Sequence, residues 1–499
     1  MPLRQIDRRG FLQLVGALVV AACTEAVPTL SPRPASPRPT VSPTPRGTAA
    51  PSEPSTEEPT ESPTEEPSGQ PFADFVYVGG TILTMAPTSP LVSAIAVRDG
   101  RVIAVGDDAS VRQHTQASTP VIDLGGRALL PGFNDAHCHR IGDRGVWGYE
   151  SAEDAIAETL ANGFTSISEL FVNQERLDEL VVLDRAGALR LRVNAYLPVN
   201  FLEDKFGVWF EHLRPHQQMS PNVRIGGVKV FADRAAPGQL LLSEDHPGQP
   251  GYQGDRYWAP GELDDLFSGL HAGGWQIAVH SCGDAAHDMV MDAFASALGG
   301  GPNDARHRIE HLMVLRDDQI ARMAEMGMLA SMQLSWFDSA WTEEWERDLP
   351  GWSDFLARLR DILDAGVPAV GSTDCPWDYA PIGRAMRAVA DAVTRRGEGA
   401  GQPADWQARQ RITAEQALSL LTSRGAWATF EEEAKGSLEV GKLADMVVLS
   451  ADPLSIESRD LAGVEVLVTT IGGRAEYCAS GAESLCPPVS GMRRPLIAA

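Results

Sequence analysis

The sequence predicts a mixed α/β protein in which a (β/α)8 barrel, or TIM barrel, is joined to a small β-sandwich. Strand-like and helix-like segments alternate from residue 131 to about residue 430, which is the pattern of parallel strands linked by crossover helices. Eight strand-like segments fall within roughly 300 residues, the size of such a barrel. Short β-rich runs lie both before and after this region, and we expect the two sets to combine in one sandwich.

The expected barrel strands are apolar runs that end at Gly, Pro or polar residues. The first carries His137 and His139, and the others span residues 163–169, 189–197, 223–231, 275–280, 308–313, 328–333 and 367–371. Helical patterns lie between them, including residues 152–160, 174–186, 317–324 and 352–365. A doubly wound open sheet is the alternative, but no glycine-rich phosphate turn follows the first strand.

The sandwich is expected to combine residues 72–130 with residues 431–478, leaving 131–430 for the barrel and 479–499 as a tail. Its N-terminal runs cover residues 75–78, 81–85, 93–97 and 101–105, and glycine, proline and aspartate separate them as in hairpins. Its C-terminal runs cover residues 446–449 and 464–468.

Residues 1–23 have the features of an export signal. Arg8 and Arg9 resemble a twin-arginine motif, and the apolar run 11–22 is too short to span a bilayer. The run ends at Cys23 in a sequence that resembles a lipobox, so we expect Cys23 to be lipidated and to anchor the protein to the membrane outside the cytoplasm. A soluble protein with an apolar start is the alternative. Residues 24–71, rich in Pro, Ser, Thr and Glu, are expected to form a disordered tether.

The formal net charge of −25 argues against nucleic acid and against an anionic membrane surface as partners. The only membrane contact that we expect is therefore the N-terminal lipid anchor. A hydrophobic content of 43% and a charged content of 22% are ordinary for a globular protein.

His137 and His139 are the strongest local signal for chemistry. On a strand they share one face, and Cys138 between them points to the other face. They lie near the C-terminal end of a buried strand, where barrel enzymes keep their functional residues. Two imidazoles on one face are half of a zinc site, although alone they could be polar surface.

Four more polar residues stand at expected strand ends: Lys229, His280, His311 and Asp374. Lys229 lies in an apolar strand, so it either reaches solvent or a carboxylate, or it is a neutral amine that carries CO2 as a carbamate. One histidine at a strand end is usually a packing residue, but two after a His-x-His pair favour a metal. Asp374 is either the N-cap of the next helix or a ligand and base.

Cys138, Cys282 and Cys375 each neighbour one of these residues, and we interpret them as packing residues. Cys478 and Cys486 are different, because an extracytoplasmic location would permit a disulfide between them.

Taken in order, the His137-x-His139 pair, Lys229, His280, His311 and Asp374 resemble the metal-dependent amidohydrolase superfamily. The likeness is greatest to its YtcJ-like branch, which includes the N-substituted formamide deformylases. Segments 228–233, 308–311, 412–418 and 435–445 support it, and the resemblance covers about residues 72–477.

The resemblance implies a centre of one or two divalent metals, most often Zn2+. His137, His139 and Asp374 would hold the first metal, and a carboxylated Lys229 would bridge to a second held by His280 and His311. It also implies that metal-activated hydroxide cleaves a non-peptide C–N bond of a small amide or formamide, with Asp374 as the catalytic base and acid. Hydrolysis of an ester, lactone or phosphoester is a second possibility, and a non-catalytic solute-binding or scaffold lipoprotein is a third.

Two features depart from the family pattern. The long insertion that commonly follows the His-x-His pair is missing, and Arg234 follows Asp233 where the family has glycine. Both put the substrate in doubt and suggest a more open pocket, with the tryptophans as candidate lining residues: Trp147, Trp336, Trp341 and Trp377.

Overall fold

The structure is a computed structural model that describes residues 72–377, 383–397, 401–488 and 496–497. The expected export signal, Cys23 and the tether lie outside these residues. Among the described helices, none has the length and apolar character needed to cross a membrane.

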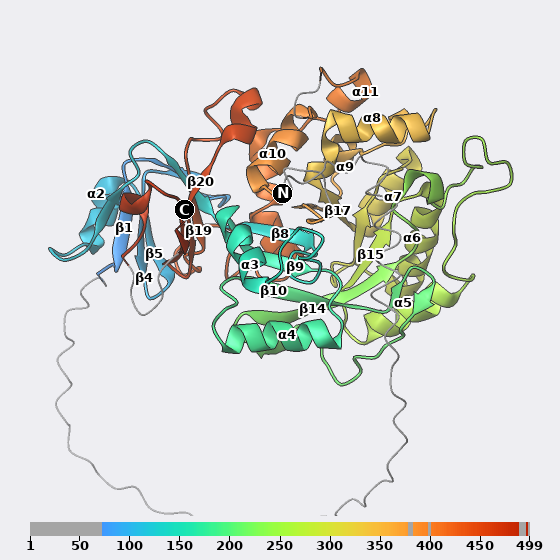
Figure 1. The fold of residues 1–499 in the computed structure, drawn as a ribbon, viewed down its shortest axis with the longest axis horizontal. Helices are drawn as coiled ribbons and strands as arrows, with labels where there is room; N and C mark the ends of the chain where they lie inside the picture. The colour runs from blue at the N-terminus through green and yellow to red at the C-terminus, as the bar shows by residue number, and fades with distance from the viewer. Residues whose placement is uncertain (1–71, 378–382, 398–400, 489–495, 498–499) are drawn as a thin grey trace, which may run out of the picture. The chain divides into compact units, whose positions relative to one another are not determined.

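The larger sheet is a parallel barrel, in which each strand is hydrogen-bonded to the next one along the chain (Figure 1). Its strands are β8 (Phe133–Cys138), β9 (Phe164–Glu169), β10 (Arg192–Pro198), β14 (Val223–Phe231), β15 (Ile277–Ser281), β16 (Arg308–His311), β17 (Leu329–Gln333) and β18 (Ala369–Ser372). The first and last strands, β8 and β18, lie side by side, and just past β18 the Asp374 backbone N–H donates to the His137 carbonyl at 2.8 Å. The sheet is therefore nearly closed, which excludes the doubly wound alternative.

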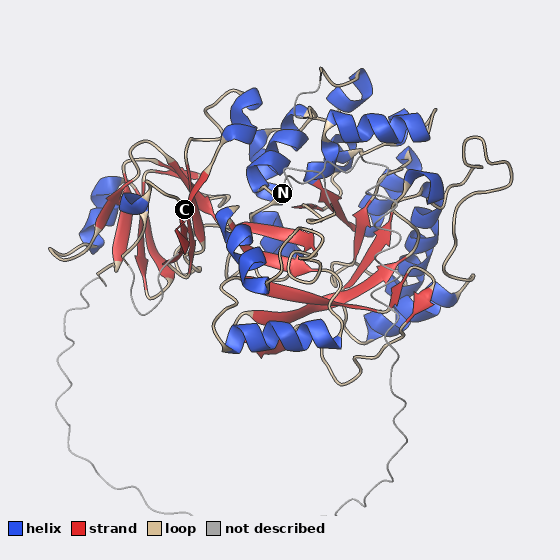
Figure 2. Cartoon of the chain, in the orientation of Figure 1, coloured by secondary structure: helices blue, strands red, loops and turns tan. Residues whose placement is uncertain are grey.

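Helices cover the outside of the barrel (Figure 2). They are α3 (Ala152–Ala161), α4 (Gln174–Arg185), α5 (Glu262–Ala272), α6 (Asp284–Leu298), α7 (Asp317–Met326), α8 (Ser339–Asp348), α9 (Leu359–Asp364), α10 (Ala385–Thr394), α11 (Asp405–Ala408), α12 (Ala414–Leu420) and α13 (Ser423–Ala428). Buried apolar residues of strands and helices form one continuous core, for example Ile167, Val193 and Ile277 from the sheet with Leu160 and Phe267 from the helices. This core holds the strand ends, and so the site described below, in fixed positions.

The smaller part is a β-sandwich built from both ends of the folded chain. One sheet has the order β5-β4-β1-β6, and the other has the order β22-β21-β20-β19-β7-β2-β3. The strands are β1 (Phe75–Val78), β2 (Thr81–Leu83), β3 (Leu91–Val92), β4 (Ala94–Arg98), β5 (Arg101–Gly106), β6 (Val121–Asp123), β7 (Ala128–Pro131), β19 (Met446–Leu449), β20 (Val466–Ile471), β21 (Arg474–Cys478) and β22 (Leu496–Ile497). Since β7 pairs with both β2 and β19, it joins the two chain ends in one sheet.

Several expected boundaries differ from the structure; for example, the strand expected at 189–197 is β10, which begins only at Arg192. Residues 352–365 are not one helix: α9 begins only at Leu359, because the backbone of residues 355–357 pairs with the loop after β16 instead, where Leu356 forms a bridge with Val314. The strand expected at 464–468 is β20, which begins and ends later.

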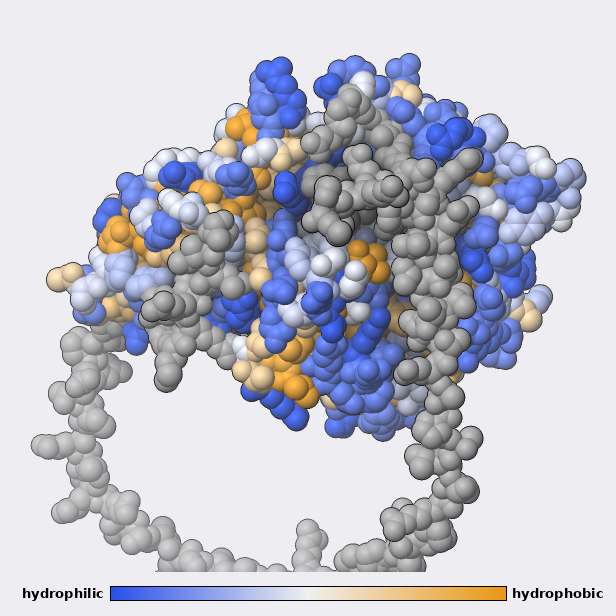
Figure 3. All heavy atoms as spheres, viewed as in Figure 1, coloured by the Kyte–Doolittle hydropathy of each residue, from blue (hydrophilic) through white to orange (hydrophobic). Residues whose placement is uncertain are grey.

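Hydrophilic residues predominate on the barrel side of the face drawn in Figure 3, with smaller hydrophobic areas between them. This agrees with a chain that has 67 acidic and 42 basic residues.

Candidate metal centre

All six residues expected at the site meet at the C-terminal ends of the barrel strands. His137 belongs to β8 and His139 follows it, Lys229 lies in β14, His280 in β15, and His311 ends β16. Neighbouring imidazole centroids are 5.4 Å apart for His137 and His139, 4.9 Å for His137 and His311, and 4.4 Å for His280 and His311. Each of these side chains is buried.

His137, His139 and Asp374 form the first half of the site. The Asp374 Oδ1 atom lies 3.3 Å from Nε2 of both His137 and His139. This oxygen is buried and has no hydrogen-bond partner. Two imidazole nitrogens and one carboxylate oxygen that converge in this way, with the oxygen unsatisfied, suit a divalent cation. Asp374 is not a helix cap, because the next described helix, α10, begins only at Ala385.

Lys229, His280 and His311 form the second half. The Lys229 ammonium nitrogen is fully buried without a hydrogen-bond partner and lies 4.9 Å from the Phe231 ring centre. Burial lowers the pKa of Lys229 to about 8, although Glu310 and Asp374 oppose the shift. The solvent-reaching alternative for Lys229 is therefore wrong. A buried lysine with a lowered pKa is the form that can carry CO2.

Three of the site imidazoles, those of His137, His280 and His311, are held in the neutral form. Burial lowers the pKa values of His137, His280 and His311 well below the usual value, and the charge of Lys229 lowers them further. Neutral imidazole is the form that binds a metal. Burial has the opposite effect on Asp374 and raises the pKa of its carboxyl group.

Two polar residues orient these histidines, and sequence reasoning did not assign either of them a role. The Glu310 carboxylate lies 2.7 Å from His137 Nδ1, and Gln333 Oε1 lies 2.8 Å from His311 Nδ1. Both contacts fix the N–H on Nδ1 and leave Nε2 free for a ligand. Glu310 is itself held by the guanidinium of Arg308 inside the barrel. Arg308 and Glu310 are two residues apart on one strand and so share a face. This spacing was the sequence signal that could have revealed the role of Glu310.

A second polar cluster joins the first strand to the last. Asp135 of β8 accepts the Thr373 backbone N–H at 3.0 Å and the Thr373 hydroxyl at 2.6 Å. Arg140 donates to the same carboxylate and to the carbonyl of Gly383 at 2.9 Å. These bonds lock the segment that carries His139 to the segment that carries Asp374.

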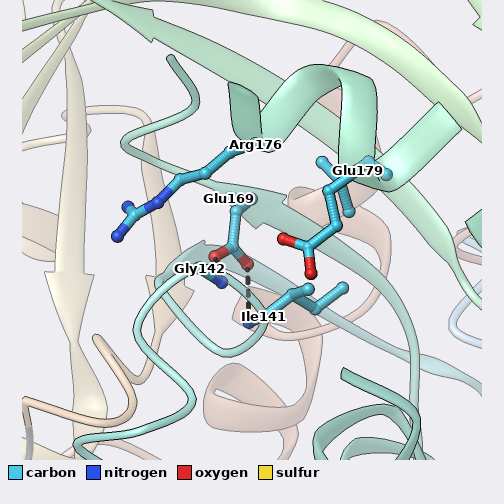
Figure 4. Close-up of a pocket in the computed structure, with 6 residues that line it drawn as sticks. Ile141, Gly142, Glu169, Arg176 and Glu179 are labelled. Carbon is cyan, nitrogen blue, oxygen red and sulfur yellow. Dashed lines mark hydrogen bonds between the residues drawn. The ribbon is translucent and has the colours of Figure 1, made fainter. Parts of the chain in front are cut away.

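The short connection after His139 is fixed against β9 and α4. Figure 4 shows Glu169 facing the backbone of Ile141 and Gly142, and its carboxylate accepts the Gly142 N–H at 2.7 Å. Asp143 accepts bonds from Arg176 at 2.6 Å and from the Trp377 indole N–H at 3.0 Å. The short segment after His139 is thus held by β9, by α4 and by the loop after β18.

Aromatic rings cover two of the histidines. Phe231 stacks on His280 at 5.1 Å, and Trp336 stacks on His311 at 5.0 Å. Of the expected pocket tryptophans, Trp336 is therefore at the site, while Trp377 binds Asp143 as described above. Trp147 is half-buried and packs against Arg140, and the side chain of Trp341 lies outside the described part of the chain.

The cysteines behave differently from one another. Cys138 points away from the site and contacts the Ser168 carbonyl. Cys282 was expected to be a packing residue, but its sulfur atom lies 3.5 Å from His280 Nε2. Cys282 therefore contacts a residue of the site. Cys478 and Cys486 are joined by a disulfide.

Imidazoles around an unsatisfied buried carboxylate, at the C-terminal end of a parallel barrel, define a metal-dependent hydrolase as the class of this protein. Residues 148–477 match the model of the amidohydrolase family, and the chain belongs to that family. The match does not include His137 and His139, because it begins at residue 148. It is the structure that places this pair beside Asp374.

Curated relatives agree with this family. The chain is 30% identical over 266 residues to the N-substituted formamide deformylase of Arthrobacter pascens, an alignment that covers 52% of this chain and 47% of the relative. It is 27% identical over 267 residues to YtcJ of Bacillus subtilis, which is named as an amidohydrolase, covering 52% and 48%. The chain thus spans about half the length of these two relatives. An imidazolonepropionase of Symbiobacterium thermophilum is 28% identical over 401 residues, covering 72% and 83%.

The fold is shared with solved structures. A metal-dependent hydrolase from Pyrococcus horikoshii superposes with a TM-score of 0.65 at 21% identity, covering 77% of this chain and 99% of the other. A metal-dependent hydrolase from Pyrococcus furiosus gives a TM-score of 0.62 at 22% identity, covering 76% and 99%.

Proposed function

We propose that this protein hydrolyses a non-peptide C–N bond in a small amide or formamide. The observation that carries the proposal is the convergence of two histidines on the unsatisfied Oδ1 atom of Asp374. The relative named N-substituted formamide deformylase supports the choice of bond.

His137, His139 and Asp374 would hold one divalent ion, and Lys229, His280 and His311 would hold a second. Zn2+ fits this set best, because the donors are mainly imidazole nitrogens. When bound, such an ion lowers the pKa of water towards neutrality and polarises a carbonyl group. Lys229 would act as a carbamate, which gives the second half of the site the negative charge that its neutral donors lack.

Asp374 has the position of a proton carrier, beside both histidines of the first half. Hydrolysis adds the oxygen of water to the carbonyl carbon and a proton to the nitrogen while the C–N bond breaks. The Asp374 carboxylate would accept the water proton and deliver it to the leaving nitrogen. Burial raises the pKa of Asp374. A higher pKa helps the carboxylate to accept the proton from water and still allows it to pass that proton to the leaving nitrogen.

The experiment is a hydrolysis screen with the metal-loaded full chain. N-formyl and N-acyl amines are compared with esters, lactones and phosphoesters, and the product of each bond (amine, carboxylic acid or alcohol) is measured for the wild type and for Asp374→Asn. Release of amine by the wild type alone supports the proposal. Turnover confined to esters, lactones or phosphoesters would move the proposal to those bonds. Tight ligand binding that Asp374→Asn keeps, with no turnover of any class, would favour a binding protein.

We also propose that the protein is an exported lipoprotein. The support is Arg8 and Arg9 before a short apolar run that ends at Cys23. Labelling with a fatty-acid analogue tests this: wild type should carry the label in the membrane fraction, and Cys23→Ser should lose it. An unlabelled wild-type protein would refute the anchor and leave the hydrolase proposal untouched.

A further inference from the structure

A second group of metal-ligand side chains includes His280. Asp233, His280 and Cys282 each offer one ligand atom, and these atoms all lie within 4.8 Å of one another. Cys282 Sγ is 3.5 Å from His280 Nε2, and Asp233 Oδ1 is 4.0 Å from the same nitrogen. We refer to these three residues as the accessory cluster.

The distances fit a tetrahedral ion. With bonds of about 2.3 Å to sulfur and 2.0–2.1 Å to nitrogen and oxygen, tetrahedral ligands lie about 3.5 Å apart for S and N and about 3.4 Å apart for N and O. The Cys282–His280 separation already has this value. For the N–O distance, Asp233 Oδ1 at 4.0 Å would have to approach His280 Nε2 by about 0.6 Å.

The residues of the accessory cluster are buried, and hydrogen bonds hold Asp233 in position. Asp233 and Cys282 are fully buried. Three backbone N–H groups hold the Asp233 carboxylate, from Leu241 at 3.2 Å, Cys282 at 2.9 Å and Gly283 at 2.8 Å. Hydrogen bonds of this kind orient carboxylates that bind metals. Cys282 is a free thiol.

His280 connects the accessory cluster to the candidate metal centre. Its Nε2 atom faces Cys282 and Asp233, so only Nδ1 is left for an ion shared with Lys229 and His311. One imidazole ring therefore has a nitrogen for each of two ions.

We propose that Asp233, His280 and Cys282 form an accessory binding site for a soft divalent cation such as Zn2+ or Cd2+. Thiolate and imidazole select ions of this type over Mg2+ and Ca2+. Binding forms a metal–sulfur bond and releases the thiol proton to solvent, and the ring N–H proton of His280 is also released when both of its nitrogens hold an ion. This site shares His280 with the centre of the proposed function and differs from it in its sulfur ligand, because the donors of that centre on this chain contain no sulfur.

The test is a Cd2+ titration of the full chain after treatment with a chelator. Thiolate bound to Cd2+ gives an ultraviolet charge-transfer band that histidine and carboxylate ligands do not give. The wild type should develop this band, and its amplitude at saturation should correspond to one thiolate-bound ion per chain. Cys282→Ser should lose the band and bind one equivalent fewer, whereas Cys138→Ser should match the wild type, because Cys138 is also buried but contacts the Ser168 carbonyl.

A wild-type protein without the band, or a band that survives in Cys282→Ser, would overturn the proposal. If Cys282→Ser does not fold, anomalous diffraction from zinc-soaked wild-type crystals decides the question, with an ion about 2.3 Å from Cys282 Sγ expected. Neither readout needs turnover. A hydrolytic protein without sulfur ligation refutes only the accessory site, and sulfur ligation without hydrolysis refutes only the proposed function.

Discussion

Replacement of Glu310 by Gln should weaken both metal binding and the fold, because one carboxylate serves two buried partners. It lies 2.7 Å from His137 Nδ1, and it pairs with the buried guanidinium of Arg308. Loss of such a partner behind a metal-binding histidine typically costs 10–100-fold in affinity, or about 1.4–2.7 kcal/mol.

The effect on stability is separate and larger. Arg308 and Glu310 are both completely buried, and removal of one partner of a buried ion pair costs about 3–5 kcal/mol. Arg308 keeps bonds to the Ala136 carbonyl at 2.6 Å and to the Ser331 hydroxyl at 3.2 Å, so the lower part of this range applies. A protein with the usual 5–15 kcal/mol of stability should remain folded.

Two assays separate the effects. Equilibrium dialysis at buffered free Zn2+ measures affinity, and urea unfolding of the metal-free protein measures stability. Glu432→Gln is the matched control, because Glu432 also pairs with an arginine, Arg306, at 2.6 Å, but its side chain is 32% exposed. This control should cost at most about 1 kcal/mol. If the two variants have the same zinc affinity and the same stability, the assigned role of Glu310 is wrong.

Asp374→Asn should lower hydrolysis by about 10²–10⁴-fold, the usual loss of a general acid–base group, and a steady-state assay at saturating metal measures it; a loss below tenfold would contradict the proton-carrier role. The pKa of Lys229 is lowered to about 8, so roughly a tenth of it is neutral at pH 7, and metal reconstitution in CO2-free buffer should yield low activity that bicarbonate restores; activity that is independent of bicarbonate would argue against the carbamate. Burial lowers the pKa of His307 to about 3. His307 is therefore protonated below about pH 6.5 in the unfolded chain, but only below about pH 3 in the folded chain. Stability is therefore lost as the pH falls through this window, by at most about 5 kcal/mol for this group, and His307→Gln should flatten the urea-unfolding free energy between pH 6 and pH 4; an unchanged slope would contradict the assignment.

The barrel could be predicted because each of its strands is a short apolar run closed by a turn residue. This pattern located β9 and β14 within a residue or two. It failed at residues 352–365, where the apolar spacing is helical but the backbone of Leu356 has an extended partner in Val314. Sequence periodicity reports which side chains are buried, and it cannot report which distant backbone competes for the hydrogen bonds.

The site was predictable only as far as strand alternation holds. Alternation places His137 and His139 on one face, and the structure agrees. On β16 the same rule places Glu310 and His311 on opposite faces, yet Glu310 contacts His137 and the His311 ring lies 4.9 Å from it. The backbone explains this: His311 has a φ angle of 79°, and the next residue is also left-handed.

A left-handed backbone at a residue other than glycine costs roughly 1–2 kcal/mol. Two ligand residues of the site have this conformation, His311 at the end of β16 and Asp374 just after β18. Asp374 has a φ angle of 58°, and its N–H bond to the His137 carbonyl holds it there. Strain of this kind persists only where surrounding contacts enforce it, and it concentrates at functional sites. Glycine at position 311 or 374 would relieve the strain but would remove a ligand. The chain therefore carries the strained conformation at the two positions where a turn and a metal donor must be the same residue, and no pattern of residue types could have shown that.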